Sequence, residues 1–223
     1  MDFYKTDYDI SSWAELPVPG DWQMYGYDYP IYVNIDYPFP KTAPLPPKDF
    51  NPVGSYRYRF EIADSWNGKE IFIHFDGVNS AFYLWINGRK VGYHEDSKTA
   101  AEFNITKYLQ KGANDLAVEV YRWCDGSYLE DQDFWRLSGI ERDVYLLATP
   151  KVRIQDFFVK ADLDDSYADG LFRLDVVLRN HLSTDISAYS LIMKVMDGDR
   201  TVFSEEKKPE KGTAPSHKVD FAG

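Results

Sequence analysis

The stretch Tyr56-Arg57-Tyr58-Arg59-Phe60-Glu61-Ile62 decides the fold of this chain, because apolar and charged residues alternate strictly along it. Successive side chains of an extended strand point to opposite faces, so the three aromatic residues and Ile62 share one face and the charged residues share the other. We therefore predict a half-buried β-strand here.

The sequence that follows this stretch repeats the strand signal. Ile71, Ile73 and Phe75 alternate in the same way, and the apolar run 81–86 is separated from residues 89–93 only by Asn87-Gly88. Both residues of that pair tolerate positive φ, so they predict a tight hairpin. Further strands are predicted at 116–123, 143–148, 152–161, 171–178, 189–196 and 201–205. Only 106–112 indicates a helical turn, so the pattern predicts an all-β sandwich fold.

Two breaks organise the chain. Six prolines fall within residues 38–53, and because proline lacks the ladder N–H, we predict an ordered surface crossover there instead of an interior strand. The second break is Thr149-Pro150, after which the aromatic-rich composition ends. We therefore predict two domains, residues 1–149 and residues 150–223.

Composition excludes several classes of function. The chain has 25 basic and 36 acidic residues and no basic patch, so nucleic acid is not expected as a partner. Cys124 is the single cysteine, which excludes an intrachain disulfide and a cysteine-cluster metal site and suggests a small buried residue. No apolar stretch is long enough to span a membrane and residues 1–16 lack a signal-peptide pattern, so we expect a soluble protein with no membrane partner.

Acidic and aromatic residues are densest between Arg122 and Ile140. Aromatic rings can stack on a sugar ring while carboxylates accept hydrogen bonds from its hydroxyls, so this stretch could bind a saccharide. The residues alone slightly favour the alternative, an acidic surface loop whose aromatic residues close the end of the sandwich. A catalytic pair formed by Glu130 and Asp131 is not expected, because adjacent side chains point apart and retaining glycosidases hold two carboxyls about 5 Å apart.

A second candidate stretch, Gly20 to Asn34, is rich in aromatic residues and ends in an amide. That amide could bind a sugar hydroxyl, but an asparagine near a turn more often bonds its own backbone. His181 and His217 are expected in loops, and the chain's histidines show no metal-ligand spacing.

The motifs Pro19-Gly20-Asp21-Trp22-Gln23-Met24, Asp76-Gly77-Val78-Asn79-Ser80-Ala81-Phe82, Trp85-Ile86-Asn87-Gly88 and the stretch 122–144 resemble large bacterial β-galactosidases of glycoside hydrolase family 2, the lactose-hydrolysing type. The resemblance is strong over 17–150. It implies a galactose-binding-like jelly roll that lends loops to an active site at the mouth of a (β/α)₈ barrel. Residues 151–223 resemble, only loosely, the start of an immunoglobulin-like sandwich, which has roughly 100 residues when complete.

The resemblance also assigns two site residues. Asn34 corresponds to the asparagine that reaches the galactosyl group, and Asp133 corresponds to the aspartate that contacts the sugar and ligates sodium. The other sodium ligands, the magnesium ligands and the two catalytic glutamates of these retaining enzymes lie in the barrel. We therefore expect no catalytic residue, no cofactor and no activity in these 223 residues alone.

The parent protein is then expected to hydrolyse terminal non-reducing β-D-galactose residues, to use sodium and magnesium, and to be a homo-oligomer in the cytoplasm or periplasm of a bacterium. Two alternatives stay open. One is a free-standing carbohydrate-binding module, and the other is a family 2 relative with another sugar specificity, since the sandwich fold does not fix the substrate.

Overall fold

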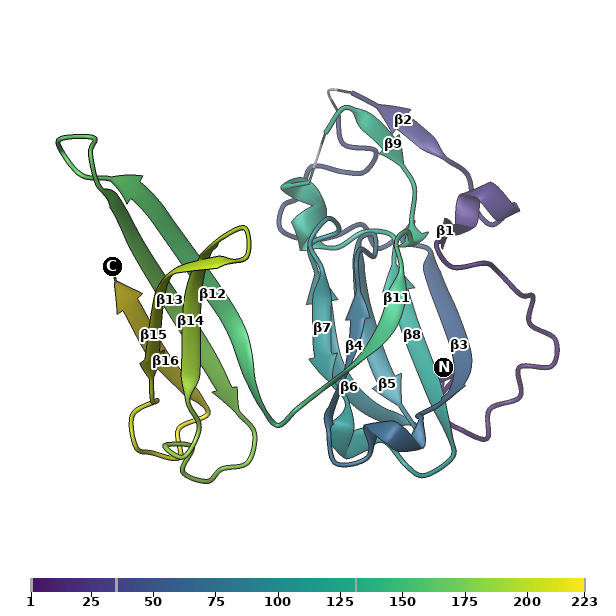
Figure 1. Ribbon diagram of the computed structural model, residues 1–223. Helices are drawn as coiled ribbons and strands as arrows, with labels where there is room; N and C mark the ends of the chain where they lie inside the picture. The colour runs from purple at the N-terminus through teal and green to yellow at the C-terminus, as the bar shows by residue number, and fades with distance from the viewer. Residues whose placement is uncertain (1, 35, 131, 223) are drawn as a thin grey trace. The chain divides into compact units, whose positions relative to one another are not determined.

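A computed structural model describes residues 2–34, 36–130 and 132–222 and shows an all-β chain (Figure 1). The chain divides into two compact units, Met1–Asn67 with Ile71–Ala148, and Gly68–Glu70 with Thr149–Gly223. Within the described residues, no helix has the length and apolar character needed to cross a membrane.

The first unit is a jelly-roll sandwich of antiparallel sheets. One sheet has four strands in the order β3-β8-β5-β6, and the other has three in the order β11-β4-β7. Their bounds are Val53–Glu61 (β3), Glu70–Phe75 (β4), Ala81–Ile86 (β5), Arg89–Glu95 (β6), Ala101–Asn104 (β7), Ala113–Tyr121 (β8) and Val144–Thr149 (β11). Two smaller pairings join β1 (Gly20–Asp21) to β10 (Gly139–Ile140), and β2 (Ile31–Val33) to β9 (Phe134–Arg136).

Several segments adopt the local structures that their sequence predicts. Asn87 and Gly88 have φ of 51° and 73°, and they close the β5–β6 hairpin by placing Ile86 opposite Arg89. The proline-rich segment stays irregular until β3 begins at Val53, and Thr106–Tyr108 makes a single 3₁₀ turn. The remaining short 3₁₀ turns are Trp22–Tyr25, Asp64–Trp66 and Asp125–Tyr128.

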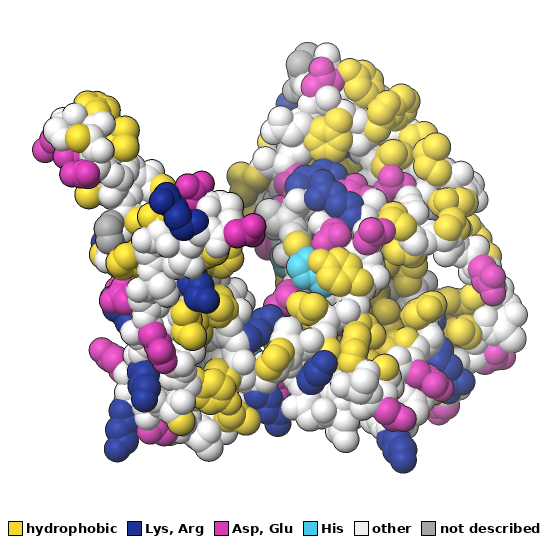
Figure 2. Space-filling model, in the orientation of Figure 1, with side chains coloured by type: hydrophobic (Ala, Val, Ile, Leu, Met, Phe, Trp, Pro, Cys, Tyr) yellow, Lys and Arg dark blue, Asp and Glu magenta, His cyan; other side chains and the backbone are white. Residues whose placement is uncertain are grey.

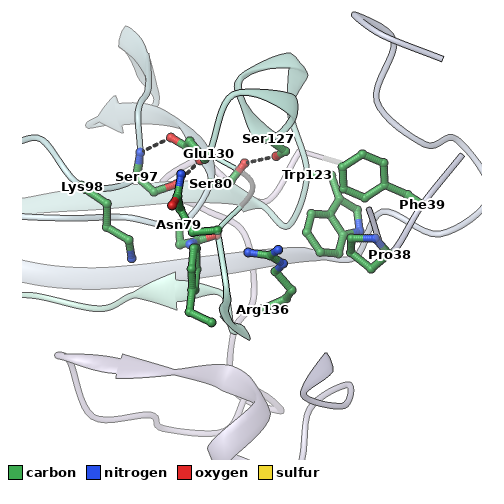
Figure 3. A pocket seen from close by; sticks show the side chains of 12 residues that line it. Pro38, Phe39, Asn79, Ser80, Ser97, Lys98, Trp123, Ser127, Glu130 and Arg136 are labelled. Carbon is green, nitrogen blue, oxygen red and sulfur yellow. Dashed lines mark hydrogen bonds between the residues drawn. The ribbon is translucent and has the colours of Figure 1, made fainter. Parts of the chain in front are cut away.

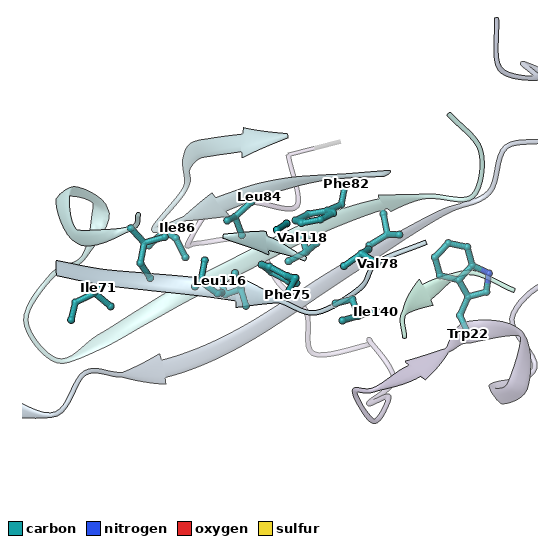
Figure 4. Packing of buried hydrophobic residues seen from close by; sticks show 14 residues of the cluster. Trp22, Ile71, Phe75, Val78, Phe82, Leu84, Ile86, Leu116, Val118 and Ile140 are labelled. Carbon is teal, nitrogen blue, oxygen red and sulfur yellow. The ribbon is translucent and has the colours of Figure 1, made fainter. Parts of the chain in front are cut away.

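The core of the first unit lies between its two sheets (Figure 4). Phe82, Leu84 and Ile86 of β5 are fully buried there and face Ile73 and Phe75 of β4 across the interior. Each such side chain contributes about 1.5–3 kcal/mol of hydrophobic stabilisation relative to exposure. The alternation that predicts these strands therefore also builds the core.

Strand β3 departs from simple alternation in two ways. Tyr56 and Phe60 pack on the core as predicted, whereas Tyr58 on the same face is 67% exposed. On the opposite face Arg57 is covered, because its guanidinium donates to the carbonyls of Phe3 and Lys5 at 2.6 and 2.8 Å. The N-terminal residues thus form a small aromatic cluster on the outer face of the four-stranded sheet.

The second unit is a partial immunoglobulin-like sandwich. Its strands are β12 (Val152–Leu163), β13 (Gly170–Asn180), β14 (Leu191–Asp197), β15 (Arg200–Lys207) and β16 (Ser216–Ala222), arranged as sheets β12-β13-β16 and β14-β15. Val176, Leu178, Met193 and Phe221 form much of its core. These five described strands are fewer than the seven of a complete constant-type domain.

The expectation that His217 lies in a loop is wrong. His217 belongs to β16, where it pairs with Leu178 of β13, and it is buried with its Nε2 3.0 Å from the carbonyl of Ala214. Exposed and buried residues alternate strictly over its seven positions, but a polar residue takes the first inward position, so the pairing with β13 decides the strand.

Candidate functional site

A short two-stranded ribbon brings the two predicted site residues together. Strand β2 pairs antiparallel with β9, with Tyr32 opposite Trp135 and Val33 opposite Phe134. Asn34 follows the last residue of β2, and Asp133 precedes the first residue of β9. Both therefore flank the same end of the ribbon, and both are exposed. Figure 1 shows this ribbon beyond one end of the sandwich strands.

Asp133 is oriented by a residue that the sequence pattern does not single out. The hydroxyl of Tyr32 donates to Oδ1 of Asp133 at 2.6 Å. This hydrogen bond and the negative charge of Asp133 raise the pKa of Tyr32, so the phenol stays a donor at neutral pH. Only one carboxylate oxygen accepts this bond, so the other can accept from a hydroxyl or ligate a cation.

The same ribbon carries an aromatic surface. The rings of Tyr32 and Trp135 lie 5.5 Å apart, and these side chains are 53% and 56% exposed. An exposed aromatic pair beside a carboxylate and an amide combines an apolar face with hydrogen-bonding groups, which is the combination that a pyranose needs. The ribbon can therefore bind one edge of a sugar.

A buried ion pair anchors the ribbon to the sandwich. Arg122, directly after the end of β8, is fully buried, and its Nη1 pairs with Oδ2 of Asp28, which lies between the Trp22–Tyr25 turn and β2. Its Nη2 donates to the carbonyl of Arg136 in β9 at 3.0 Å. Desolvation lowers the pKa of Arg122, while the charge of Asp28 opposes that effect. Arg122 therefore holds the segment before β2 and the end of β9 with one guanidinium.

A cavity of about 340 Å³ lies next to the ribbon (Figure 3). Figure 3 shows Arg136 between the aromatic side of the cavity, formed by Trp123 and Phe39, and its polar side near Lys98. The further lining residues are Pro38, Asn79, Ser80, Ser97, Ser127, Glu130, Gln132 and Phe134. Six residues of the stretch 122–140 thus line one hollow.

Several residues of that stretch have structural roles. Both oxygens of the Glu130 carboxylate accept from Ser97, one from its backbone N–H and one from its hydroxyl, each at 2.7 Å. The hydroxyl of Tyr128 lies 3.0 Å from the carbonyl of Pro40 and 2.9 Å from that of Leu45, which fixes the proline-rich crossover. Asp131, the sequence neighbour of Glu130, lies outside the described residues.

One group of potential metal ligands comes together in the described part of the chain, and Asp133 is not in it. The ligand atoms of Glu95, Cys124 and Asp125 lie within 4.8 Å of one another. Burial raises the pKa of the Cys124 thiol, and the hydroxyl of Ser80 lies 3.0 Å from its sulfur. A protonated thiol is a poor ligand for a hard cation, so Cys124 serves as the small buried residue that the sequence predicts.

Comparison with known proteins gives a consistent result. The sequence profile described as "Glycosyl hydrolases family 2, sugar binding domain" matches residues 4–150. A β-galactosidase of Priestia megaterium is 46% identical over 202 residues, which cover 89% of this chain and 20% of that protein. A β-galactosidase of Vibrio cholerae is 52% identical over 179 residues, which cover 78% of this chain and 17% of that protein. The chain thus spans about a fifth of the length of these relatives.

Solved structures show the same fold. A β-glucuronidase of Bacteroides uniformis superposes with a TM-score of 0.75 at 20% identity, covering 99% of this chain and 25% of that one. A glycosyl hydrolase family 2 member from Bacteroides cellulosilyticus gives a TM-score of 0.65 at 25% identity, covering 98% of this chain and 28% of that one.

Proposed function

Because the chain belongs to glycosyl hydrolase family 2 and its residues 4–150 match the sugar-binding domain of that family, we propose that it is the non-catalytic N-terminal portion of a β-galactosidase. The parent enzyme hydrolyses terminal non-reducing β-D-galactose residues, as in lactose. Asn34 and Asp133 contact the galactosyl group. The observation that carries this proposal is their position at one exposed end of the β2–β9 ribbon.

Galactose is favoured over glucuronic acid by two arguments. The curated relatives named β-galactosidase share 46% and 52% identity over most of this chain, whereas the β-glucuronidase shares 20%, which supports only the fold. In addition, a glucuronide brings a carboxylate to a site that already holds the carboxylate of Asp133. Two like charges at close range repel, whereas a neutral galactoside can donate hydroxyl hydrogen bonds to Asp133.

This portion binds the substrate and leaves the bond cleavage to the rest of the enzyme. Retaining hydrolysis needs two carboxyls about 5 Å apart, one as nucleophile and one as acid and base. Both would lie in a separate barrel, together with the magnesium ligands. The 223 residues alone are therefore inactive, and their part is to orient the sugar ring and to exclude water from one side of it.

Asp133 also suits the sodium ion that the family resemblance implies. Its carboxylate is exposed and is a hard oxygen ligand, and the bond from Tyr32 fixes its orientation. A single carboxylate cannot complete a cation site, so the remaining ligands would come from the barrel. When bound there, the cation would orient its oxygen ligands beside the sugar.

The test uses the full-length gene product with nitrophenyl β-galactoside, β-glucuronide and β-mannoside at equal concentrations. We expect the galactoside to have the highest kcat/KM, and the 223-residue chain to release no nitrophenol from any of them. Preference for the glucuronide or the mannoside would overturn the substrate assignment. Turnover by the isolated chain would overturn the division of roles.

A second candidate, a free-standing carbohydrate-binding module, is favoured by the exposed aromatic pair on the ribbon. Titration of the 223-residue chain with galactose separates the two. An independent module binds with micromolar to low-millimolar affinity, whereas half of a pocket gives no saturable signal in that range.

A further inference from the structure

A second hollow of the first unit lies along the side of the sandwich and has a volume of about 1720 Å³. Its walls come from the two edge strands, β3 and β11, and from the irregular residues 10–18. We call it the edge groove. Figure 2 shows hydrophobic side chains gathered on this side of the unit, where the surface is hollowed.

The floor of the edge groove is the core itself. Ile73 and Phe75 of β4 and Leu116 and Val118 of β8 line it, and all four belong to the central cluster. Small-molecule pockets usually have about 300–1,000 Å³, so this volume exceeds what a sugar or a cofactor fills. The opening also explains why Tyr58, on the core face of β3, is 67% exposed.

The walls of the edge groove present free strand edges. Residues 52–58 and 143–146 line it without a gap in sequence, as consecutive residues do where the edge of a strand faces a hollow. Among the described strands, each of β3 and β11 has a single neighbour in its sheet. The nine residues of β3 keep an unbroken register with β8 and include no proline. An edge of this kind is a template for pairing with another strand.

Residues 10–18 do not serve as that strand. They line the groove in irregular conformation, and among the described residues no backbone hydrogen bond joins them to β3 or β11. Within the described part of the chain, the outward N–H and C=O groups of the two edges thus have no backbone partner in residues 10–18. Their preferred partner is an extended backbone.

The dimensions of the edge groove define the chemistry of its occupant. The walls are six and nine residues long, which suits a strand of about the same length, roughly 20–30 Å. One face of that strand must be apolar to cover the core, so large apolar residues should recur at every second position. Glu15 and Asp143 on the walls are exposed acids, whereas Asp28 is paired with Arg122, so basic residues suit the other face.

We propose that the edge groove binds an additional β-strand, supplied by the remainder of a longer polypeptide, that pairs with the free edge of β3 and closes the core with alternate apolar side chains. The length of the relatives supports this source, because the matched residues are about a fifth of each and most of their chain lies elsewhere. The inference rests on the proposed membership in a longer enzyme, but not on its sugar specificity.

The experiment measures binding of the 223-residue chain to tiled twelve-residue peptides that cover the translated gene on both sides of it. We expect one contiguous segment with period-two apolar residues to bind. N-methylation at alternate positions of that peptide should lower affinity at least tenfold, while methylation at the intervening positions changes it less than threefold, because only every second N–H faces β3.

Matched substitutions locate the binding. Tyr58→Lys, at an exposed position in the groove, should lower affinity at least tenfold, whereas Tyr189→Lys, at an exposed position in the second unit, should change it less than twofold. If no tiled peptide binds, or if the gene encodes nothing beyond these residues, the inference is wrong. Concentration-dependent dimerisation lost in Tyr58→Lys would assign the groove to a second copy and would also overturn it.

The outcomes separate this inference from the proposed function. A full-length enzyme that hydrolyses galactosides while no peptide binds contradicts the inference alone. A peptide that binds with the expected N-methyl pattern, from an enzyme that prefers glucuronides, contradicts the substrate assignment alone.

Discussion

The substitution Asp28→Asn tests how the ribbon is held on the sandwich. Asp28 has a positive φ of 65°, a conformation that asparagine adopts as readily as aspartate, and the two side chains have nearly the same shape. The substitution therefore removes the negative charge next to Arg122 and leaves the backbone and the packing in place. What remains is a buried guanidinium without its counter-charge.

The expected loss follows from the burial of the pair. The side chain of Arg122 is 0% exposed and that of Asp28 is 10% exposed. Removing one partner of a buried pair costs about 3–5 kcal/mol, and because the amide oxygen can still accept one hydrogen bond, we expect about 3 kcal/mol. A typical domain has only about 5–15 kcal/mol of stability, so the effect is large.

Urea unfolding followed by tryptophan fluorescence measures this loss. The six tryptophans all lie in the first unit, so the signal reports that unit alone: Trp13, Trp22, Trp66, Trp85, Trp123 and Trp135. With a slope of about 1–3 kcal/mol per molar urea, the midpoint should fall by roughly 1–3 M.

The control is Asp36→Asn, which removes the charge from a pair with Lys41 whose two side chains are both more than 60% exposed. It should leave the midpoint unchanged, because exposed pairs contribute little. Adding Arg122→Met to Asp28→Asn should recover at least half of the loss, since the stranded charge is then gone. Equal midpoints for Asp28→Asn and the control would refute the reasoning.

Three further predictions concern single side chains. Burial raises the pKa of Tyr56 to about 12, whereas tyrosines of the unfolded chain ionise near pH 10. The free energy of unfolding therefore falls by up to about 3 kcal/mol as the pH rises from about 10 through 12. In Tyr56→Phe the urea midpoint should depend less on pH over this range. The same pH dependence as in the wild type would contradict the prediction. In the full-length enzyme, Tyr32→Phe removes the hydrogen bond to Asp133 and should lower kcat/KM for the galactoside about two- to tenfold. It should also raise the sodium concentration that gives the half-maximal rate. If neither quantity changes, Tyr32 does not position Asp133. Asn34→Ala should raise KM about five- to tenfold, as expected for one lost hydrogen bond, and an unchanged KM would remove Asn34 from the sugar site.

Much of the fold is predictable because its signals are local. Alternation over Tyr56 to Ile62 and the Asn87-Gly88 turn act within a few residues, and both structures form as predicted. Strands β7 and β16 escape such prediction, because Ala101–Asn104 has only four residues and the alternation of Ser216–Ala222 has a histidine at its first inward position. Their pairing with β4 and β13 decides their conformation.

The site could be predicted only in part. Sequence physics alone favours a turn role for Asn34 and a surface loop around Asp133, and only the family resemblance singles out these two residues. Their proximity depends on β2 pairing with β9 across about a hundred residues, which no local pattern specifies. Tyr32 escapes prediction for the same reason, although its place two residues before Asn34 puts it on a predicted aromatic stretch.

The burial of Arg122 and the edge groove lie beyond local prediction as well. A charged residue at the end of a strand normally suggests exposure, and only the tertiary structure places Asp28 and the carbonyl of Arg136 around it. The groove lies between two strand edges that are far apart in sequence. Its trace in β3 is the exposed side chain of Tyr58, because Tyr56 and Phe60 on the same face pack on the core as predicted.

The most direct test of the central claim is the kcat/KM of Asp133→Ala for a nitrophenyl β-galactoside in the full-length enzyme, measured across a range of sodium concentrations. If the β2–β9 ribbon forms one side of the galactose site, kcat/KM falls about tenfold to hundredfold, which is the loss expected for a hydrogen bond to a charged group, and the response to sodium disappears. Wild-type kcat/KM with an unchanged sodium response would show that this end of the ribbon does not touch the sugar.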